Sequence, residues 1–489
     1  MAERLSSIEA IMWRTGHDAT LRMAVGTLMV LDHLPERDAV IARLEFAAQQ
    51  APRLRWRLDD PTGTRSRPSW VEVPDFSAAR HLRTMAVGSP GDRRQLLDLV
   101  GLLEPAPFEP DRGPWDVTLI EGLEGGRAAL YLRAHHVLTD GQGGLSMIGL
   151  LIDEAMPPPP PPEPIPEALD ADAIAEDVAD AIPPEGEAKP KRKPGTVSIN
   201  IDLTSAAAPV AQGVAASVSF AKTINPIDVL VRSVQWGLDM ASSVSHQVVV
   251  TGGRLSPIPP SGATTSRFEV LTFNDARDAA RALGGSRNDL LVAAASAGLG
   301  LYHEKVGAPC YELRLALPTT QHRDGGAYGG NWVAPTRVEV PTNADHPGPH
   351  FGIVAERIAK ARREPVMRMA SGVASVVGHL PTRVLAPAFH AQANSVDFVA
   401  TAVPGFRTER HIGGALIEEC FPFGPRLGCL ANISALANGD RLDIGIAVDP
   451  HAIPDSDLLV ECLAEAFRAY VPEPERISPE RRRPTRTTS

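Results

Sequence analysis

Cysteine is scarce in this 489-residue sequence, and its spacing argues against the usual cysteine-based sites. The four cysteines, Cys310, Cys420, Cys429 and Cys462, lie in the second half of the chain and form no C-x-x-C pair. Structural zinc sites and disulfide frameworks depend on paired spacings. No cysteine has a local base that would mark a catalytic thiol. We therefore predict reduced, mostly buried thiols in a cytosolic protein.

A membrane-spanning run and a signal peptide are also missing from the sequence. A helix that crosses a bilayer needs about 20 apolar residues, and the best candidate, Leu145 to Ile152, is far shorter. Residues 1–9 do not combine a basic segment with a continuous apolar core, so no secretory signal is predicted. These features predict a cytoplasmic protein.

An excess of basic residues is absent as well. The chain carries 48 Lys and Arg against 59 Asp and Glu, which gives a formal net charge of -11 and a pI of about 5.7. Proteins that bind nucleic acid need clustered Lys and Arg for the phosphates, so we predict a small-molecule or protein partner instead. The length exceeds the size at which single cores stop growing, which predicts two domains.

Proline, by contrast, is concentrated in one segment. Six consecutive prolines, Pro157–Pro162, begin a stretch rich in Pro, Ala, Asp and Glu. Proline favours extended structure and blocks helix continuation, so residues 157–196 are predicted to be a disordered acidic linker. This linker would separate an N-terminal domain, residues 1–156, from a C-terminal domain, residues 197–474. The arginine-rich residues 475–489 are predicted to form a disordered tail.

Hydrophobic periodicity and capping signals predict the main elements. Helices are expected from Ser7 and at Asp38–Gln50, Gly144–Glu154, Pro226–Ala241, Asn288–Val306 (with Asn288 or Asp289 as its cap) and Asp455–Tyr470. Strands are expected at Val25–Leu31, Ala128–Ala134, Tyr311–Leu317, Asn331–Val340, Ala431–Leu436 and Arg441–Val448, and near Trp70 and Val117. Asn438-Gly439 predicts a hairpin between the last two of the long strands.

The heptapeptide His135-His136-Val137-Leu138-Thr139-Asp140-Gly141 follows one of these strands and contains a potential base and a carboxylate. Side chains alternate along a strand, so His136 shares a face with Leu130, whereas His135 shares the other face with Arg133. Two adjacent strand histidines cannot easily aim at one ion, which disfavours a metal site. His136 is therefore a candidate general base, and ordinary polarity at a strand end is the alternative.

Further motifs occur in a fixed order along the chain. They are Leu5-Ser6-Ser7-Ile8-Glu9-Ala10, Gly113-Pro114-Trp115, Leu119-Ile120-Glu121-Gly122-Leu123, the heptapeptide, Asn288-Asp289-Leu290, Leu317-Pro318 through Arg323, Gly330-Asn331, Val340-Pro341 and Val403-Pro404-Gly405. Their order resembles the bacterial wax ester synthase/diacylglycerol acyltransferase family, part of the CoA-dependent acyltransferases with an HHxxxDG motif. Ala402 and Phe406 depart from the family's NVPGP pattern.

The resemblance implies a fold and a reaction. The fold would be α/β (α+β) with mixed sheets, arranged as two chloramphenicol-acetyltransferase-like domains around a central channel. The reaction would be O-acylation of a lipid alcohol with acyl-CoA as co-substrate, from diacylglycerol to triacylglycerol, from a long-chain alcohol to a wax ester, or both. No cofactor is expected, because the thioester already supplies an activated carbonyl. The protein would be cytoplasmic and would contact the plasma membrane or lipid droplets peripherally.

The resemblance also implies roles for single residues. His136 would take the proton of the alcohol and return it to the CoA thiolate, with His135 and Asp140 as its framework and Gly141 as the turn. Residues proposed to bind substrate are Asn288, Asp289, Thr319, Thr320, Arg323, Gly330 and Asn331. A plain helix cap is the alternative for the first two, and a structural role is the alternative for the last three.

Two other functions stay open from the sequence. The donor could be the thioester of a carrier protein, as in condensation domains, or the chain could be a non-catalytic lipid-binding homologue.

Overall fold

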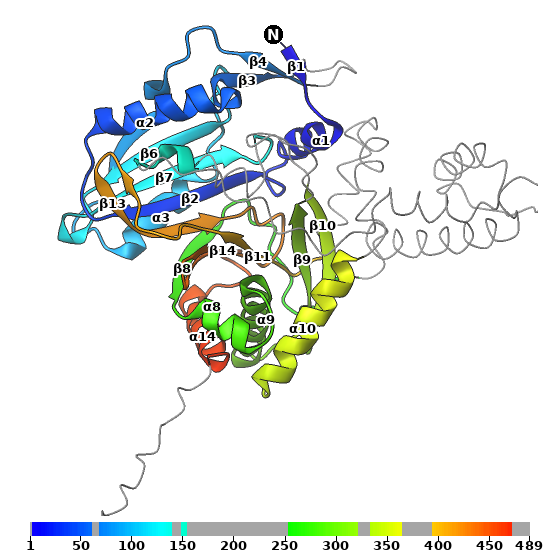
Figure 1. Ribbon diagram of the computed structural model, residues 1–489. Helices are drawn as coiled ribbons and strands as arrows, with labels where there is room; N and C mark the ends of the chain where they lie inside the picture. Colours follow the sequence, from blue (N-terminus) through cyan, green and yellow to red (C-terminus); the bar gives the residue numbers. More distant parts are fainter. Residues whose placement is uncertain are drawn as a thin grey trace, which may run out of the picture. The chain divides into compact units, whose positions relative to one another are not determined.

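The computed structural model describes residues 2–60, 68–138, 148–153, 253–320, 333–363 and 394–471 (Figure 1). All of them belong to one of the two compact units of the chain, Met1–Pro158 with Ser243–Ser489. The predicted linker, the arginine-rich tail and the predicted helix Pro226–Ala241 lie outside the described residues, as does most of Gly144–Glu154. None of the described helices is long and apolar enough to span a bilayer.

The first large sheet is mixed and has the strand order β12-β13-β2-β7-β6-β5. Its strands are β2 (Ala24–Leu31), β5 (Leu82–Ala86), β6 (Trp115–Glu121), β7 (Ala128–His135), β12 (His411–Ile412) and β13 (Ala415–Phe423). Only the β5–β6 pair in this sheet is parallel. The predicted strands at Val25–Leu31 and Ala128–Ala134 and near Val117 are confirmed.

The second large sheet is also mixed, with the order β10-β9-β11-β14-β15-β8. Its strands are β8 (Arg267–Phe273), β9 (Glu312–Thr320), β10 (Val333–Pro341), β11 (Phe398–Pro404), β14 (Ala431–Asn438) and β15 (Arg441–Val448). Strand β11 runs parallel to both β9 and β14. A small third sheet contains β1 (Ala2–Arg4), β3 (Trp56–Asp59) and β4 (Ser69–Glu72).

The predicted hairpin between β14 and β15 is present, with its turn one residue later than expected. Asn438 pairs with Arg441, so Gly439 and Asp440 form the two-residue loop. Gly439 has φ +59°, the left-handed conformation that such a loop demands and that glycine adopts without strain.

The structure describes seven helices, and four of them begin at a side-chain cap. The seven are α1 (Ser7–Thr15), α2 (Arg37–Gln50), α3 (Arg93–Leu103), α8 (Ala276–Ala282), α9 (Arg287–Lys305), α10 (Pro347–Arg362) and α14 (Ser456–Ala469). Short 3-10 turns occur at Pro52–Arg55, Ala78–Arg80 and Glu124–Gly126. Capping boxes start α1, α3 and α9, and Asp455 caps α14.

Strand β13 comes from the C-terminal half of the sequence but pairs with β2 of the first sheet. Cys420 of β13 lies opposite Met29, and both side chains are buried. The first sheet is therefore completed by residues far beyond the predicted boundary between residues 1–156 and 197–474. The domain division itself stays a prediction, and the strand pairing crosses it.

Three clusters of buried apolar side chains hold these layers together. One packs α9, α10 and α14 against the second sheet, and another packs α2 against one face of the first sheet. A third joins the other face of the first sheet to α3, β8 and β13 through Leu28, Val30, Leu97, Phe268 and Phe421. The four cysteines are free, and all but Cys310 are buried, as predicted.

Close helix packing generates a first prediction, at Gly298 of α9. A Cβ atom there would lie 2.8 Å from the Cα of Leu463 in α14, so main chain would have to move. We expect Gly298→Ala to lower Tm and to destabilise the fold by about 1–3 kcal/mol. Gly352→Ala in α10 is the matched control, because that site is open and alanine favours a helix by about 0.5–1 kcal/mol over glycine. Equal Tm values in the two variants would contradict the prediction.

Candidate active site

Main-chain hydrogen bonds fix the histidine pair at the end of β7. The N–H of His135 donates to the carbonyl of Pro114, just before β6, at 2.8 Å. The N–H of His136 donates to the carbonyl of Met23, just before β2, at 2.7 Å. The main chain before each neighbouring strand therefore binds one of the two histidines, and these bonds fix the main-chain positions of both residues.

The structure confirms the predicted alternation of side chains along β7. Leu130 and Ala134 belong to the core cluster that includes α2, whereas Ala129 and Tyr131 belong to the cluster on the opposite face. His135 is on the same face as Tyr131 and is 7% exposed. His136 follows the strand in a turn and is partly exposed.

His135 is a buried, neutral imidazole with a defined tautomer. Its Nδ1 accepts the Val137 N–H at 3.1 Å, so the ring proton is on Nε2. Trp13 packs edge-on against the ring, with centroids 5.1 Å apart. Burial lowers the pKa of His135 to about 3, and the charges of His136 and His17 act in the same direction. His135 can therefore support its neighbour but cannot exchange protons near neutral pH.

Gly16 makes room for this ring. It ends α1, and a Cβ atom at this position would lie 2.8 Å from Nε2 of His135. The helix that begins at the capping box of Ser6 and Glu9 thus finishes directly against the histidine.

Arg133 was not identified as a site residue from the sequence. A charged residue within an otherwise apolar strand is the signal that could have indicated it. Its guanidinium is buried and donates to the carbonyls of Leu103, Glu104 and Ala106 at the end of α3. It also forms an ion pair with Asp116 of β6. A buried cation needs hydrogen-bond acceptors for its whole guanidinium group, and these contacts supply them. Arg133 is two residues before His135 in β7, so it ties the end of α3 to the strand that carries the histidine pair.

The ND motif separates into two different roles. Asp289 belongs to the capping box of α9, where its carboxylate accepts the N–H of Ser286 at 2.9 Å. The expectation that Asn288 or Asp289 is itself the cap residue was wrong, because Ser286 occupies that position. Asp289 is thus engaged within its own helix end, which favours the capping role over the proposed substrate contact.

Asn288 bridges α9 and β11 and keeps one donor available. Its Oδ1 accepts the main-chain N–H of Ala402 at 3.1 Å. The family pattern that this chain resembles has asparagine where this chain has Ala402. The donor in this bond is the main-chain N–H of residue 402, so the bond does not require an asparagine side chain there. Its Nδ2 is buried and has no acceptor among the described residues. Asn288 can therefore donate a hydrogen bond to a bound molecule.

The remaining predicted residues are placed only in part. Thr319 and Thr320 lie in β9, where they pair with Ala334 and Val333. Asp140, Gly141, Arg323, Gly330 and Asn331 lie outside the described residues, and their roles stay predictions.

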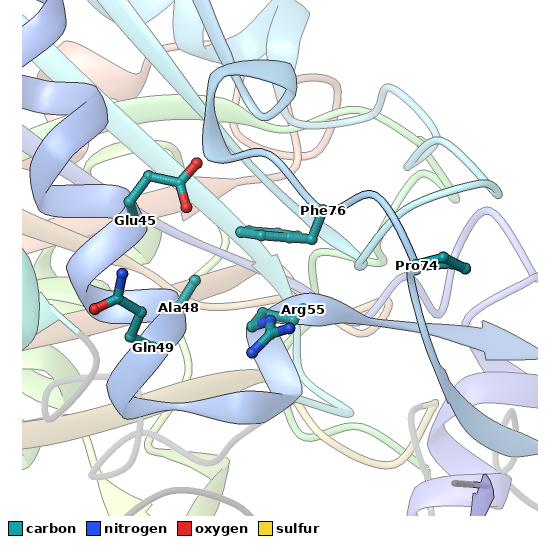
Figure 2. A pocket seen from close by; sticks show the side chains of 6 residues that line it. All are labelled: Glu45, Ala48, Gln49, Arg55, Pro74 and Phe76. Carbon is teal, nitrogen blue, oxygen red and sulfur yellow. The ribbon is translucent and has the colours of Figure 1, made fainter.

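A surface pocket beside α2 is distinct from these groups. Its lining residues are Glu45, Ala48, Gln49, Arg55, Pro74 and Phe76, and Figure 2 shows the Phe76 ring extending toward the helix. Glu45 is already engaged there, because it accepts the Ala78 N–H at 2.7 Å. No predicted site residue lines this pocket, so we do not assign it to the reaction.

Comparison with known proteins defines the class of this chain. Residues 5–291 match the wax ester synthase/diacylglycerol acyltransferase catalytic domain, and residues 329–470 match the C-terminal domain of the same family. The chain therefore belongs to the wax ester synthase/diacylglycerol acyltransferase family and is an O-acyltransferase.

Relatives of full length support this assignment. A Mycobacterium tuberculosis protein provisionally named a diacylglycerol O-acyltransferase is 28% identical over 96% of this chain and 91% of its own length. The provisionally named diacylglycerol O-acyltransferase tgs1 of the same organism is 22% identical, covering 95% of each chain.

Solved structures show the same fold. The wax ester synthase/diacylglycerol acyltransferase from Marinobacter aquaeolei VT8 matches with a TM-score of 0.54 at 20% identity, over 92% of this chain and 94% of that one. The first condensation domain of the CDA synthetase matches with a TM-score of 0.56 at 16% identity, over 96% of each chain. The predicted chloramphenicol-acetyltransferase-like α/β fold with mixed sheets is confirmed.

The burial of His135 yields a second prediction, about protonation. NMR of histidine-labelled protein should show the His135 ring neutral, with its proton on Nε2, from pH 7 down to about pH 4, because its pKa is about 3. The unfolded chain binds this proton near pH 6.5. His135 therefore contributes stability that is complete above pH 6.5 and is lost as the pH falls toward 3.

His135→Asn should flatten the loss of Tm between pH 6.5 and pH 4 relative to the native protein. His346→Asn is the control, because the His346 side chain is exposed. Titration of the His135 ring above pH 5 would contradict this assignment.

Proposed function

We propose that this protein transfers the acyl group of an acyl-CoA to the hydroxyl of a lipid alcohol, with His136 as the general base. The products would be triacylglycerol from diacylglycerol, a wax ester from a long-chain alcohol, or both. The observation that carries the proposal is the placement of a partly exposed His136 beside a buried, neutral His135 in a chain of this family.

The chemistry requires a base because an alcohol is barely ionised at neutral pH. As the alcohol oxygen attacks the thioester carbonyl carbon, His136 takes the hydroxyl proton. The tetrahedral intermediate then expels the thiolate of CoA, and the same histidine gives the proton to that sulfur. The new C–O bond replaces the C–S bond, and no oxidant or reductant takes part. No metal or redox cofactor is part of the proposal.

The intermediate also places negative charge on the former carbonyl oxygen, which hydrogen-bond donors stabilise. The buried Nδ2 of Asn288 supplies such a donor, held by the bond between its Oδ1 and Ala402. We propose that it donates to the acyl carbonyl or to the bound acceptor.

The lipid acceptor is insoluble in water, so the protein would collect it from a membrane or lipid droplet. This part of the proposal predicts binding to vesicles that contain diacylglycerol, which a flotation assay measures. Recovery of all protein in the vesicle-free fraction would argue against peripheral contact.

A carrier-protein thioester is the second candidate donor, suggested by the likeness to condensation domains. That likeness concerns the fold alone. Offering palmitoyl-carrier protein in place of palmitoyl-CoA tests it, and faster turnover with the carrier would replace acyl-CoA as the proposed donor.

The role of His136 gives the third prediction. With labelled palmitoyl-CoA and either diacylglycerol or hexadecan-1-ol, His136→Ala should lower kcat by about 10²–10⁴-fold, the usual contribution of a positioned base. His33→Ala, at an exposed position, should retain native turnover. Undiminished ester formation by His136→Ala would remove it as the base, and no product from the native protein with any acceptor would overturn the function.

The amide of Asn288 gives the fourth prediction. Asn288→Asp keeps an oxygen for the Ala402 N–H but removes the Nδ2 donor. We expect kcat to fall about 10-fold or more, with little change in Tm. Asn343→Asp at an exposed position is the control. Unchanged kcat would assign Asn288 a purely structural role.

A further inference from the structure

A serine and a histidine that are distant in the sequence form a hydrogen-bonded pair beside the second sheet. Oγ of Ser256, in the segment that precedes β8, lies 2.8 Å from Nε2 of His303 in α9. The histidine is buried, whereas the serine is partly exposed. A hydroxyl bonded to an imidazole nitrogen is the arrangement of a serine nucleophile and its base.

The second ring nitrogen of His303 determines which group donates in this pair. Nδ1 lies 2.7 Å from the carbonyl oxygen of Leu299, one helical turn earlier, and a carbonyl accepts but never donates. Burial lowers the pKa of His303, so the ring is neutral near pH 7. Its one proton is therefore on Nδ1, and Nε2 carries a lone pair that accepts the Ser256 hydroxyl proton.

The hydroxyl has one other acceptor within reach, the carbonyl oxygen of Ile258 at 3.1 Å. A bond to that carbonyl would leave the buried Nε2 of His303 without a donor, which destabilises a fold. The shorter contact, to Nε2, is therefore the one that uses the proton of Ser256.

A buried carboxylate holds the main chain of the serine in place. Asp397 accepts the N–H groups of Leu255 and Ser256, each at 3.1 Å. It also accepts the N–H of Arg314 in β9 at 2.7 Å. The negative charge of Asp397 raises the pKa of His303 against the effect of burial, so it favours the imidazolium that forms when this ring takes a proton.

A main-chain donor also lies at the hydroxyl. The N–H of Ile258 donates to Oγ of Ser256 at 3.1 Å. When Oγ attacks a carbonyl carbon, the oxygen that becomes negative is bonded to the same carbon as Oγ. The Ile258 N–H is therefore close to the position of the oxyanion, which such donors stabilise.

We propose that Ser256 and His303 form a serine-esterase site that hydrolyses small esters through an acyl-Ser256 intermediate. Oγ bonds to the ester carbonyl carbon, and Nε2 of His303 takes the hydroxyl proton and gives it to the alkoxide that leaves. Water then attacks the acyl carbon, and the same nitrogen takes a proton from the water and returns it to Oγ. Each step exchanges one C–O bond for another, and no oxidant or reductant takes part.

The surroundings suit a small ester. The next residue, Pro257, is exposed, so the segment that carries Ser256 lies at the surface. Ile258 packs against the apolar cluster that includes α9 and provides an apolar contact beside the hydroxyl. A purely structural role, in which the serine closes the turn at residues 256–258, is the alternative. The two roles differ in the reactivity of Oγ.

The test is covalent labelling of the full-length protein with a fluorophosphonate, which reacts with activated serines, and mapping of the label by mass spectrometry. We expect the label on Ser256 and a burst of about one equivalent of p-nitrophenol from p-nitrophenyl acetate. His303→Asn should slow labelling about 10²-fold or more, because the base is lost, although asparagine keeps a donor for the Leu299 carbonyl. Ser261→Ala is the matched control and should be labelled at the native rate, because the Ser261 hydroxyl donates to the carboxylate of Asp449.

Native protein without label on Ser256 would overturn the inference and leave the pair a structural one. Equal labelling rates in His303→Asn and the native protein would also overturn it. Ser256→Cys tests the same base if His303→Asn does not fold: its thiol should react with iodoacetamide at pH 7 about 10-fold faster than Cys310, whose pKa burial raises to about 11. Equal rates at the two thiols would count against the base. The label is read at one residue, so the result does not depend on acyl transfer at His136.

Discussion

The pairing of β7 with β2 on one side and β6 on the other is the constraint on which the candidate site depends. The main-chain hydrogen bonds of both strand pairs continue past the ends of β6 and β2. The His135 N–H donates to the Pro114 carbonyl, and the His136 N–H donates to the Met23 carbonyl. A shift of one residue in either ladder would exchange the faces of all side chains in β7. The two histidines would then exchange environments, and a buried neutral ring would occupy the position of the proposed base.

The neighbouring histidines show how position alone gives two identical side chains two different environments. His135 is enclosed by Trp13, Phe108 and the bare main chain of Gly16, and it accepts the Val137 N–H. That environment fixes its tautomer and removes it from proton exchange near neutral pH. A neutral neighbour adds no positive charge beside His136. In the proposed reaction, His136 would therefore avoid a like-charge interaction that disfavours its protonation.

The sequence predicted those parts of the structure that local periodicity determines. The alternation along β7, the hairpin at Gly439 and the helix cap at Asp455 all follow from neighbouring residues, and each was found within about one residue. Strand β13 could not be predicted in this way. Strand β13 pairs with β2, which is nearly 400 residues earlier in the chain, and local sequence patterns do not indicate which distant strand a strand pairs with.

The same limit applies to the site, where residue type does not reveal which contacts are already made. Asp289 and Asn288 are adjacent, yet one carboxylate is used within its own helix end and one amide keeps a free donor in the described structure.

Unsatisfied buried polar groups are the more informative part of this site. The Tyr131 hydroxyl, which packs over Gly26, and the Nδ2 of Asn288 are both buried without a partner among the described residues. Burying a polar group without a partner destabilises a fold, so under the proposed function the Asn288 amide is the group whose hydrogen bond a bound molecule would complete.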